Sequence, residues 1–587
     1  MSHSRWGLQW IAGALLVSLA TACLGDAGYS NIGRQGGRVA ADGANLTIDP
    51  EVLSSQLQFK IVRANPAQLP PLNGPPGRTI QSDPFNFQTK GGEGMPATAS
   101  IPLKNPISGE TPLDVFQLYE GEWVWLTAAS NHPEGSAVAL IPALPATVVV
   151  MSPPPTAPHV SLRWSLQSPV PSDALGAALG AIDWMHPAGY EVAPEGDIIA
   201  SPGPLPPGSY QVIPVVQNGQ GGAYDGALIA DILGNEERRQ RHIDSLVALA
   251  QESGFAGLEL DYRQLDLSTR NAFTKFVIDL AQALHQRGRL LQVDVPLPHR
   301  GAGGWDDGAY DWRELGEAAD TLIIRPRKDL SFYSARIGET LGYAVTQVER
   351  HKLSLGINTS SHEKMGDGFQ ELSRSQALER AAQIKIEGTP KLISGEVVSL
   401  LAPMLTPDGS TRPLDRLTFN QEANALAFTY AVKGERRIVW IENAQSLARK
   451  LELAQQHHLG GVTLEGDFGK SNDSRLWQVL NSYRNKGRPD LPQGSDLPIP
   501  QWQSSDGSLK EKGPARVSWR LPTPGSYTVS LCLNDGSALG CQELAVTVTA
   551  PPPTPTPIPT LRPATPPPTT PSSLTTPFVP VTPPEPP

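Results

Sequence analysis

The stretch over residues 254–265 constrains the fold more than any other part of the sequence. Three apolar residues alternate in it with three charged ones: Leu258, Leu260 and Tyr262 with Glu259, Asp261 and Arg263. Side chains alternate across a β-strand, so the pattern predicts a strand with all three charged groups on one face. Helical patterns lie on both sides and another apolar strand comes next, which is typical of a parallel sheet covered on both faces. Because buried charges are costly unless paired or used, this face is either a salt-bridged layer or a reaction site.

Strand and helix patterns alternate through the centre of the chain, and the length of residues 159–487 suits a (β/α)8 TIM barrel. The predicted strands are residues 179–185, 210–217, 254–265, 290–296, 321–325, 352–358, 437–442 and 461–465. An amphipathic segment over 268–288 predicts a helix that buries Phe273, Phe276, Val277, Leu280 and Leu284. The stretch 365–430 is longer than an ordinary connection and predicts an inserted subdomain or a long loop over one rim.

Shorter β patterns flank the predicted barrel. Residues 41–151 carry short strand-like segments broken by glycine and proline, which predicts an all-β domain, and residues 152–158 form a Pro-rich linker. Residues 495–549 alternate again, and the phrase over 519–529 resembles the immunoglobulin-like and polycystic-kidney-disease-type domains of bacterial surface proteins, which implies a β-sandwich. Residues 550–587 are rich in Pro, Thr and Ser and predict a disordered, extended tail without a core.

The first residues are typical of an export signal and not of the fold. Residues 1–23 combine a basic start with a short apolar run and end in Ala20-Thr21-Ala22-Cys23, which resembles a bacterial lipobox. That resemblance implies lipidation at Cys23, a polar tether over 24–40, and a protein anchored to the outer side of the bacterial membrane. Ordinary secretion with a stray cysteine is the alternative. The remaining cysteines, Cys532 and Cys541, flank a turn signal, and an exported protein permits a disulfide between them.

Charge and cysteine content exclude several classes of partner. The formal net charge is −11, and no basic stripe offers a surface for a phosphate backbone, so we expect no nucleic-acid partner. A lone pair of cysteines is a poor zinc site, so no structural metal is predicted. Nothing in the sequence indicates a cofactor.

Residues 256–263 resemble the signature strand of glycoside hydrolase family 18, the chitinase-like barrels, which follows the pattern Asp-Gly-x-Asp-x-Asp-x-Glu. The likeness continues through 231–263, 268–298, 308–320 and 439–467, which are similar to the spore-germination branch of that family. It implies a TIM barrel whose mouth takes a glycan containing N-acetylglucosamine, of the chitin or peptidoglycan type.

The departures from the signature fall on the chemistry. In that family the final Glu protonates the leaving oxygen, and the preceding Asp orients the substrate acetamido group that acts as the nucleophile. Gly257 and Asp261 match the pattern, Glu259 conservatively replaces the middle Asp, and Ala256 replaces the first one. Arg263 stands at the position of the acid. A guanidinium does not deprotonate in proteins, so Arg263 cannot be a general acid, and the resemblance implies a pseudoenzyme.

Three hypotheses follow from these residues. In the first, the barrel binds glycan without hydrolysing it, through Glu259, Asp261, Asp294 and Glu465. In the second, a relocated carboxylate restores hydrolysis; the candidates at predicted strand ends are Asp183, Asp294, Glu442 and Glu465. In the third, the chain is a purely structural surface protein. Arg263 and Arg325 could also neutralise the neighbouring carboxylates in a buried network, which is compatible with the first and third hypotheses.

Overall fold

The architecture comes from a computed structural model. It describes residues 24–25, 28–71, 77–108, 111–154, 157–164, 179–220, 223–252, 254–405, 416–466, 468, 473–492 and 497–553. The predicted signal segment with Cys23 and nearly all of the predicted tail lie outside these ranges. Within the described part of the chain, no helix combines the length and apolar character that a membrane crossing requires.

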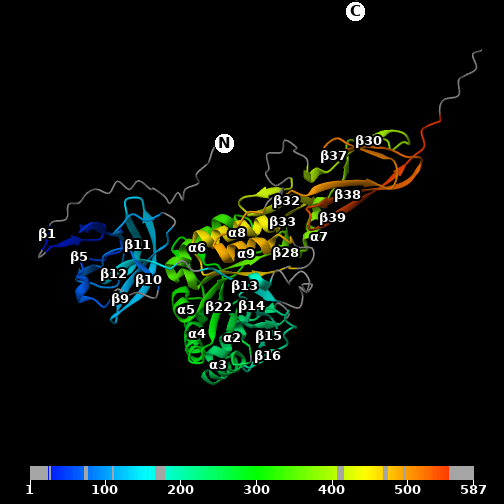
Figure 1. Ribbon diagram of the computed structural model, residues 1–587. Helices are drawn as coiled ribbons and strands as arrows, with labels where there is room; N and C mark the ends of the chain where they lie inside the picture. Colours follow the sequence, from blue (N-terminus) through cyan, green and yellow to red (C-terminus); the bar gives the residue numbers. More distant parts are fainter. Residues whose placement is uncertain are drawn as a thin grey trace, which may run out of the picture.

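Parallel strands of the central region close into a barrel (Figure 1). They are β13 His159–Trp164, β14 Trp184–Pro187, β17 Gln211–Val212 continued by β18 Val215–Gln217, β21 Gly257–Asp261, β22 Leu290–Val295, β25 Thr321–Ile324, β26 Leu353–Asn358 and β34 Gly461–Glu465. Strand β34 pairs in parallel with both β26 and β13, which closes the ring. Pro214 separates β17 from β18 because it has no N–H, yet its carbonyl still accepts from Glu259 N at 2.9 Å.

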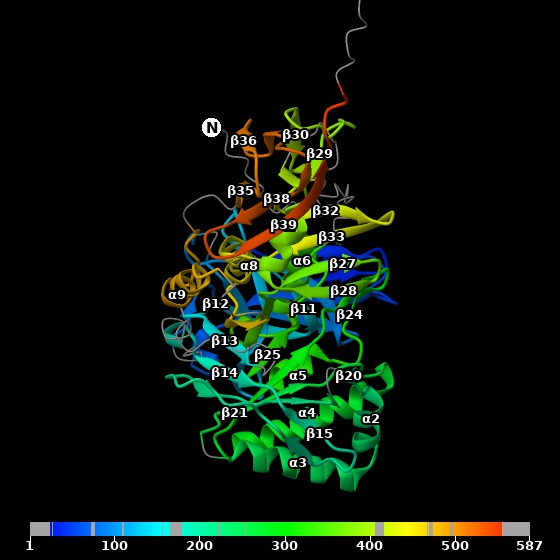
Figure 2. The same ribbon diagram turned by 90° about the vertical axis from the view of Figure 1, so that its right-hand side faces the viewer.

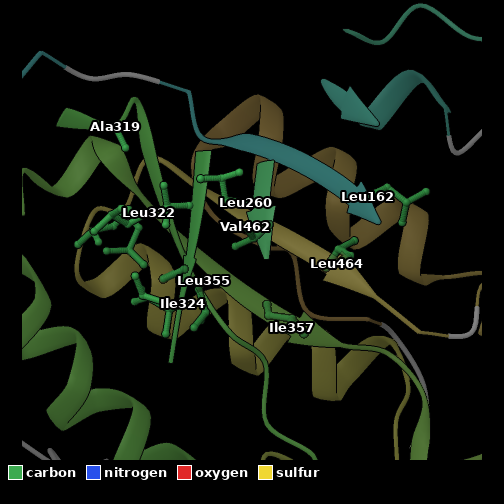
Figure 3. Packing of buried hydrophobic residues seen from close by; sticks show 14 of the residues in the cluster. Leu162, Leu260, Ala319, Leu322, Ile324, Leu355, Ile357, Val462 and Leu464 are labelled. Atoms are coloured by element: carbon green, nitrogen blue, oxygen red, sulfur yellow. The ribbon is translucent and has the colours of Figure 1, made fainter. Parts of the chain in front are cut away.

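Helices cover the outside of this barrel. They are α2 Gly226–Gly234, α3 Glu236–Ala250, α4 Arg270–His285, α5 Trp312–Ala318, α6 Tyr333–Gln347, α8 Ala444–Gln456 and α9 Leu476–Lys486. The predicted apolar stripe of α4 is confirmed, since all five of its residues are buried. Apolar side chains of the barrel strands are buried in one large core cluster, in which Leu322, Leu355 and Val462 come from the consecutive strands β25, β26 and β34 (Figure 3). Alternate residues of the same strands point to the other side, into the barrel.

Two predicted barrel strands were wrong. The first strand is β13, not residues 179–185, and it follows directly on the Pro-rich linker. The predicted strand 437–442 falls on β33 Glu435–Ile441, which pairs antiparallel with β32 Ala425–Val432 and with β27 Ser361–Met365. Lys433 and Gly434, at φ of 51° and 84°, form the two-residue turn that joins β32 to β33 as a hairpin. A strand pattern does not identify its sheet, and this turn was the overlooked signal.

The long segment between β26 and α8 is an inserted subdomain, wider than the predicted 365–430. Its five-stranded sheet has the order β28-β27-β33-β32-β31, with β28 Gly368–Leu372 and β31 Thr418–Asn420, and α7 Arg374–Ala381 packs on it. Within residues 385–401 lie two further strands, β29 Lys385–Ile386 and β30 Val397–Leu401, which do not belong to this sheet.

The C-terminal β domain draws strands from two parts of the chain. Its own strands are β35 Ile499–Ser504, β36 Ser508–Glu511, β37 Arg516–Arg520, β38 Gly525–Asn534 and β39 Leu539–Val548. One sheet is β35-β38-β39; the other is β29-β30-β37-β36, so the boundaries 495–549 omit the two strands from the insertion (Figure 2). Cys532 and Cys541 lie opposite each other on β38 and β39 and are joined by a disulfide.

The N-terminal domain is all β, and it begins before residue 41. Its strands are β1 Leu24–Gly25, β2 Tyr29–Ile32, β3 Gly37–Ala41, β4 Ala44–Ile48, β5 Leu57–Arg63, β6 Thr79–Ile80, β7 Phe85–Lys90, β8 Met95–Pro102, β9 Leu113–Tyr119, β10 Glu122–His132, β11 Ser136–Leu144 and β12 Ala146–Ser152. The predicted tether 24–40 therefore contains strands of this domain. The N-terminal domain contacts the barrel through buried charged side chains, since Arg350 Nη2 of the barrel lies 3.0 Å from Asp114 Oδ1 of the N-terminal domain.

Candidate functional site

Charged side chains from several barrel strands meet at the mouth of the barrel, at the carboxyl ends of the strands. They are Arg163 from β13, His186 from β14, Glu259 and Asp261 from β21, Asp294 from β22, Arg325 just after β25, and Glu465 from β34. Arg263 follows two residues after Asp261. All four carboxylates that the sequence singled out for binding, Glu259, Asp261, Asp294 and Glu465, are thus brought together.

Arg163 is the central cation of this cluster. Its Nη2 contacts Glu259 Oε1 and Asp294 Oδ2, and its Nη1 lies 3.3 Å from Glu465 Oε2. One guanidinium therefore serves three carboxylates from three strands. The sequence pattern did not indicate Arg163, because residues 159–164 were not predicted as a strand. A strand predicted over residues 159–164 would have placed Arg163, its fifth residue, near the barrel mouth.

Glu259 is fully buried and paired on both oxygens. Oε1 contacts Arg163, and Oε2 forms a hydrogen bond with His186 Nδ1. Burial alone would raise the pKa of Glu259, but Arg163 and then His186 outweigh it and hold this pKa below its usual range. Glu259 is therefore ionised at neutral pH. His186 Nε2 is buried and has no partner among the described residues.

Asp261 is held by four side chains. Arg263 donates to it from Nε at 2.7 Å and from Nη2 at 2.8 Å, and Gln217 and Tyr224 each donate to Oδ2 at 3.0 Å. Arg325 Nε lies 3.4 Å from Oδ1. Burial works against ionisation, but Arg163, Arg263 and Arg325 together hold the pKa of Asp261 far below its usual range.

Asp294 differs from its neighbours. It has no solvent exposure, its Oδ1 has no hydrogen-bond partner among the described residues, and it does not line the cleft described next. Burial raises the pKa of Asp294 well above its usual value, and Asp261 and Glu259 add to this despite the opposing effect of Arg163. Asp294 is thus the carboxyl that most readily takes up a proton, but a ligand in the cleft does not reach it.

An open cleft of about 660 Å³ lies over these residues. Asp261, Arg263 and Glu465 line it together with Trp164 and Tyr224. The side chain of Glu465 is 26% exposed and that of Arg263 is 32% exposed. The guanidinium carbon of Arg263 lies 4.4 Å from the centre of the Tyr224 ring, so arginine and aromatic ring stack at the rim. The size and lining suit a small polar ligand or a short segment of a polymer.

The other two carboxylates proposed for relocated catalysis lie elsewhere. Asp183 precedes β14; it accepts from Val160 N at 2.9 Å and pairs with Arg484 on α9. Glu442 pairs with the buried Lys450 of α8 and accepts from Ser446 Oγ at 2.6 Å. Both carboxylates have structural partners and neither lines the cleft. In the described part of the chain, no group of His, Cys, Asp and Glu side chains is arranged to hold a metal ion.

Comparison with known proteins finds a family model that covers strand β21. The family model described as "Glycosyl hydrolases family 18" matches residues 220–464. Among curated proteins of Bacillus subtilis (strain 168), the chain is similar to "Uncharacterized glycosylase YvbX", with 21% identity over 44% of this chain and 70% of that protein. It is also similar to "Cortical fragment-lytic enzyme", with 23% identity over 42% of this chain, and it spans only 55% of that protein.

Solved structures of similar proteins include a chitinase from Chromobacterium violaceum ATCC 12472 and the spore cortex-lytic enzyme SleL of Bacillus megaterium QM B1551. The chitinase is 22% identical, with 56% of this chain and 99% of that chain covered and a TM-score of 0.43. SleL is 16% identical, with 60% and 79% covered and a TM-score of 0.43.

Proposed function

The central barrel is a domain of glycosyl hydrolases family 18, and from that premise we propose that its mouth binds a glycan containing N-acetylglucosamine, of the chitin or peptidoglycan type, without hydrolysing it. One observation carries the proposal. Arg263 occupies the position at which the family signature has its acid, and it forms a bidentate pair with Asp261 in an open cleft. The binding surface is retained, while the proton donor is replaced.

The chemistry of these two residues explains the loss of hydrolysis. Arg263 stays protonated at any physiological pH, so it has no proton to give to a leaving group. Asp261, which would orient an acetamido group, already accepts from Arg263, Gln217 and Tyr224. A substrate would have to displace at least one of these donors before Asp261 could orient it.

Binding remains favourable in such a site. Trp164 and Tyr224 offer aromatic surface, and Arg263, Gln217 and Glu465 offer polar groups at the same cleft. A sugar presents both apolar faces and hydroxyl groups, so it fits a lining of this mixed kind. An open mouth also argues against a purely structural role, because a barrel without a ligand has no need of a polar cleft.

A titration of the purified protein with N-acetylglucosamine oligomers and with peptidoglycan glycan oligomers tests the proposal. We expect saturable binding of at least one of them and no shortened oligosaccharides after prolonged incubation. Asp261→Ala should weaken binding, whereas Asp183→Ala, on a structural carboxylate outside the cleft, should leave the affinity unchanged in protein that remains folded. Absence of binding to every oligomer would overturn the proposal.

One observation favours a second candidate, hydrolysis through a relocated acid. Glu465 lines the cleft, is partly exposed, and lies beside Arg163 and Asn358. Product analysis separates the two candidates. Hydrolysis that survives Asp261→Ala and disappears in Glu465→Ala would establish the second candidate; no product from the natural protein would exclude it.

We further propose that the mature protein is a lipoprotein held at the outer face of the bacterial membrane. The support is the sequence Ala20-Thr21-Ala22-Cys23 after a short apolar run. Mass spectrometry of the mature N-terminus should find a diacylglyceryl-modified cysteine at position 23. Cys23→Ala should then release the protein from the membrane fraction. An unmodified N-terminus at another residue would contradict this part of the proposal.

A further inference from the structure

The Nη1 end of the Arg263 guanidinium has no hydrogen-bond partner among the described residues. Asp261 accepts hydrogen bonds from Nε and Nη2 of Arg263. Pairing through Nε and Nη2 leaves the N–H bonds of Nη1 directed away from the carboxylate, because the guanidinium is planar and its fork is rigid. Since Arg263 lines the cleft and is 32% exposed, these donors are available to a ligand.

The orientation of this guanidinium is fixed before any ligand arrives. Tyr224 stacks on it at 4.4 Å. The backbone of Arg263 is held by the side chain of Asn218, which accepts from Arg263 N at 2.8 Å and donates to Arg263 O at 2.9 Å. A preorganised donor costs a ligand little ordering entropy, so its hydrogen bonds contribute more fully to affinity.

A second polar atom without a partner belongs to the same cleft. His186 lines the cleft, is fully buried, and uses Nδ1 for Glu259. Its Nε2 has no partner among the described residues. A buried polar atom left unpaired is costly, so a bound ligand that reaches Nε2 gains a hydrogen bond that the protein alone does not make.

We infer that the cleft selects glycans that carry a carboxylate beside their N-acetylated sugars, and that Arg263 Nη1 is the group that recognises this carboxylate. The inference rests on the proposed glycan-binding function. A free guanidinium N–H pair matches a carboxylate oxygen better than a sugar hydroxyl, because the bond is charge-assisted on both sides. Arg263 thus takes on a selective role at the position where a catalytic acid would stand.

Other charged side chains of the cleft affect where a ligand carboxylate is attracted. Lys328 also lines the cleft and has no ion-pair partner among the described residues. The carboxylates of Glu191 and Glu371 line it as well and repel an anion. The cleft therefore has no uniformly positive field, and a carboxylate is attracted only where it lies near Arg263 or Lys328.

Two kinds of glycan supply this chemistry, the lactyl-substituted sugars of peptidoglycan and the uronic acids of alternating polysaccharides. Calorimetric titration of the purified protein with a peptide-free peptidoglycan tetrasaccharide and with an N-acetylglucosamine–glucuronate tetrasaccharide compares them. Each is matched by the same oligosaccharide with its carboxyl groups reduced to alcohols. At least one acid should bind about tenfold more tightly than its reduced form, and the acid that does so identifies the source.

Substitutions at Arg263 assign the preference to its guanidinium. Arg263→Gln should abolish the difference between acid and reduced ligand, and Arg263→Lys should retain only part of it, since lysine keeps the charge and loses the fork. Arg241→Gln on the outer face of α3 makes the same charge change far from the cleft and should alter nothing. A thermal unfolding curve for each variant checks that it is folded.

The outcomes separate this inference from the function on which it rests. Equal affinity for acid and reduced oligosaccharides in the natural protein would overturn the inference and leave glycan binding intact. An acid preference that persists in a folded Arg263→Gln protein would also overturn it. Failure of every oligosaccharide to bind would overturn both the inference and the proposed function.

Discussion

Replacement of Arg163 by methionine should cost more stability than any exposed substitution in this protein. The side chain is 11% exposed and contacts Glu259, Asp294 and Glu465. Methionine has a similar length but no charge, so Glu259 would stay buried with His186 as its remaining partner. Removing one partner of a buried ion pair costs about 3–5 kcal/mol. At about 2–4 °C for each kcal/mol, that loss lowers the midpoint of thermal unfolding by about 6–20 °C.

The loss should depend on pH, and its sign follows from Glu259. In the natural protein the lowered pKa of Glu259 adds stability above its unfolded pKa, about 4.3, and that stability is lost as the pH falls through the folded value. Without Arg163, burial dominates and the carboxylate opposes folding at pH 7. At pH 4 the group takes up its proton at little cost, so the difference between variant and natural protein shrinks.

Calorimetric unfolding at pH 7 and at pH 4 measures both effects. Arg241→Met is the matched control, because Arg241 lies on the surface with Glu195 and Glu237 and should lose less than about 1 kcal/mol. A loss below about 1 kcal/mol for Arg163→Met at pH 7 would refute the view that this arginine holds the cluster together. An equal loss at both pH values would refute the assignment of the effect to buried carboxylates.

Three further predictions concern other parts of the molecule. Asp261→Asn leaves Arg263 and Arg325 without their carboxylate and should cost about 3 kcal/mol by denaturant titration, with Asp279→Asn on the surface as the control. Cys532→Ser with Cys541→Ser opens a loop with a sequence separation of 9 and should destabilise the C-terminal domain by about 2–3 kcal/mol, a loss that reducing agent should reproduce in the natural protein. Burial lowers the pKa of His242 to about 4, so the unfolded histidine binds a proton at a higher pH than the folded one does. The free energy of unfolding should therefore fall by up to about 3 kcal/mol between pH 6.5 and pH 4. His242→Gln should remove this pH dependence, and an unchanged pH dependence in the variant would contradict the assignment.

Much of the barrel could be predicted because its strands are short apolar runs between amphipathic helices. The strands β21, β22, β25, β26 and β34 lie where the sequence pattern placed them. The pattern failed for strands whose pairing is not decided by their own residues. Strand β33 has the composition of a barrel strand, but the hairpin turn before it commits it to an antiparallel neighbour, and β13 lies next to a proline-rich segment that concealed it.

The candidate site was predictable in part for the same reason. The period of two placed Glu259 and Asp261 on one face, and the rule that barrel sites form at the ends of strands pointed to Asp294 and Glu465. The partners of these carboxylates come from elsewhere. Arg163 lies 96 residues before Glu259 and His186 lies 73 residues before it. Spacing within the sequence holds no information on such contacts, which exist only once the barrel is closed.

We propose that this barrel retains a glycan cleft and has lost the proton donor. The most direct test measures binding and hydrolysis on one sample. The purified protein is titrated with N-acetylglucosamine and peptidoglycan glycan oligomers at pH 5 and pH 7, and the recovered oligosaccharides are then analysed by mass spectrometry. We expect saturable binding of at least one oligomer and recovery of every oligomer at its original length. Shortened products that depend on Glu465, or the absence of binding at both pH values, would contradict it.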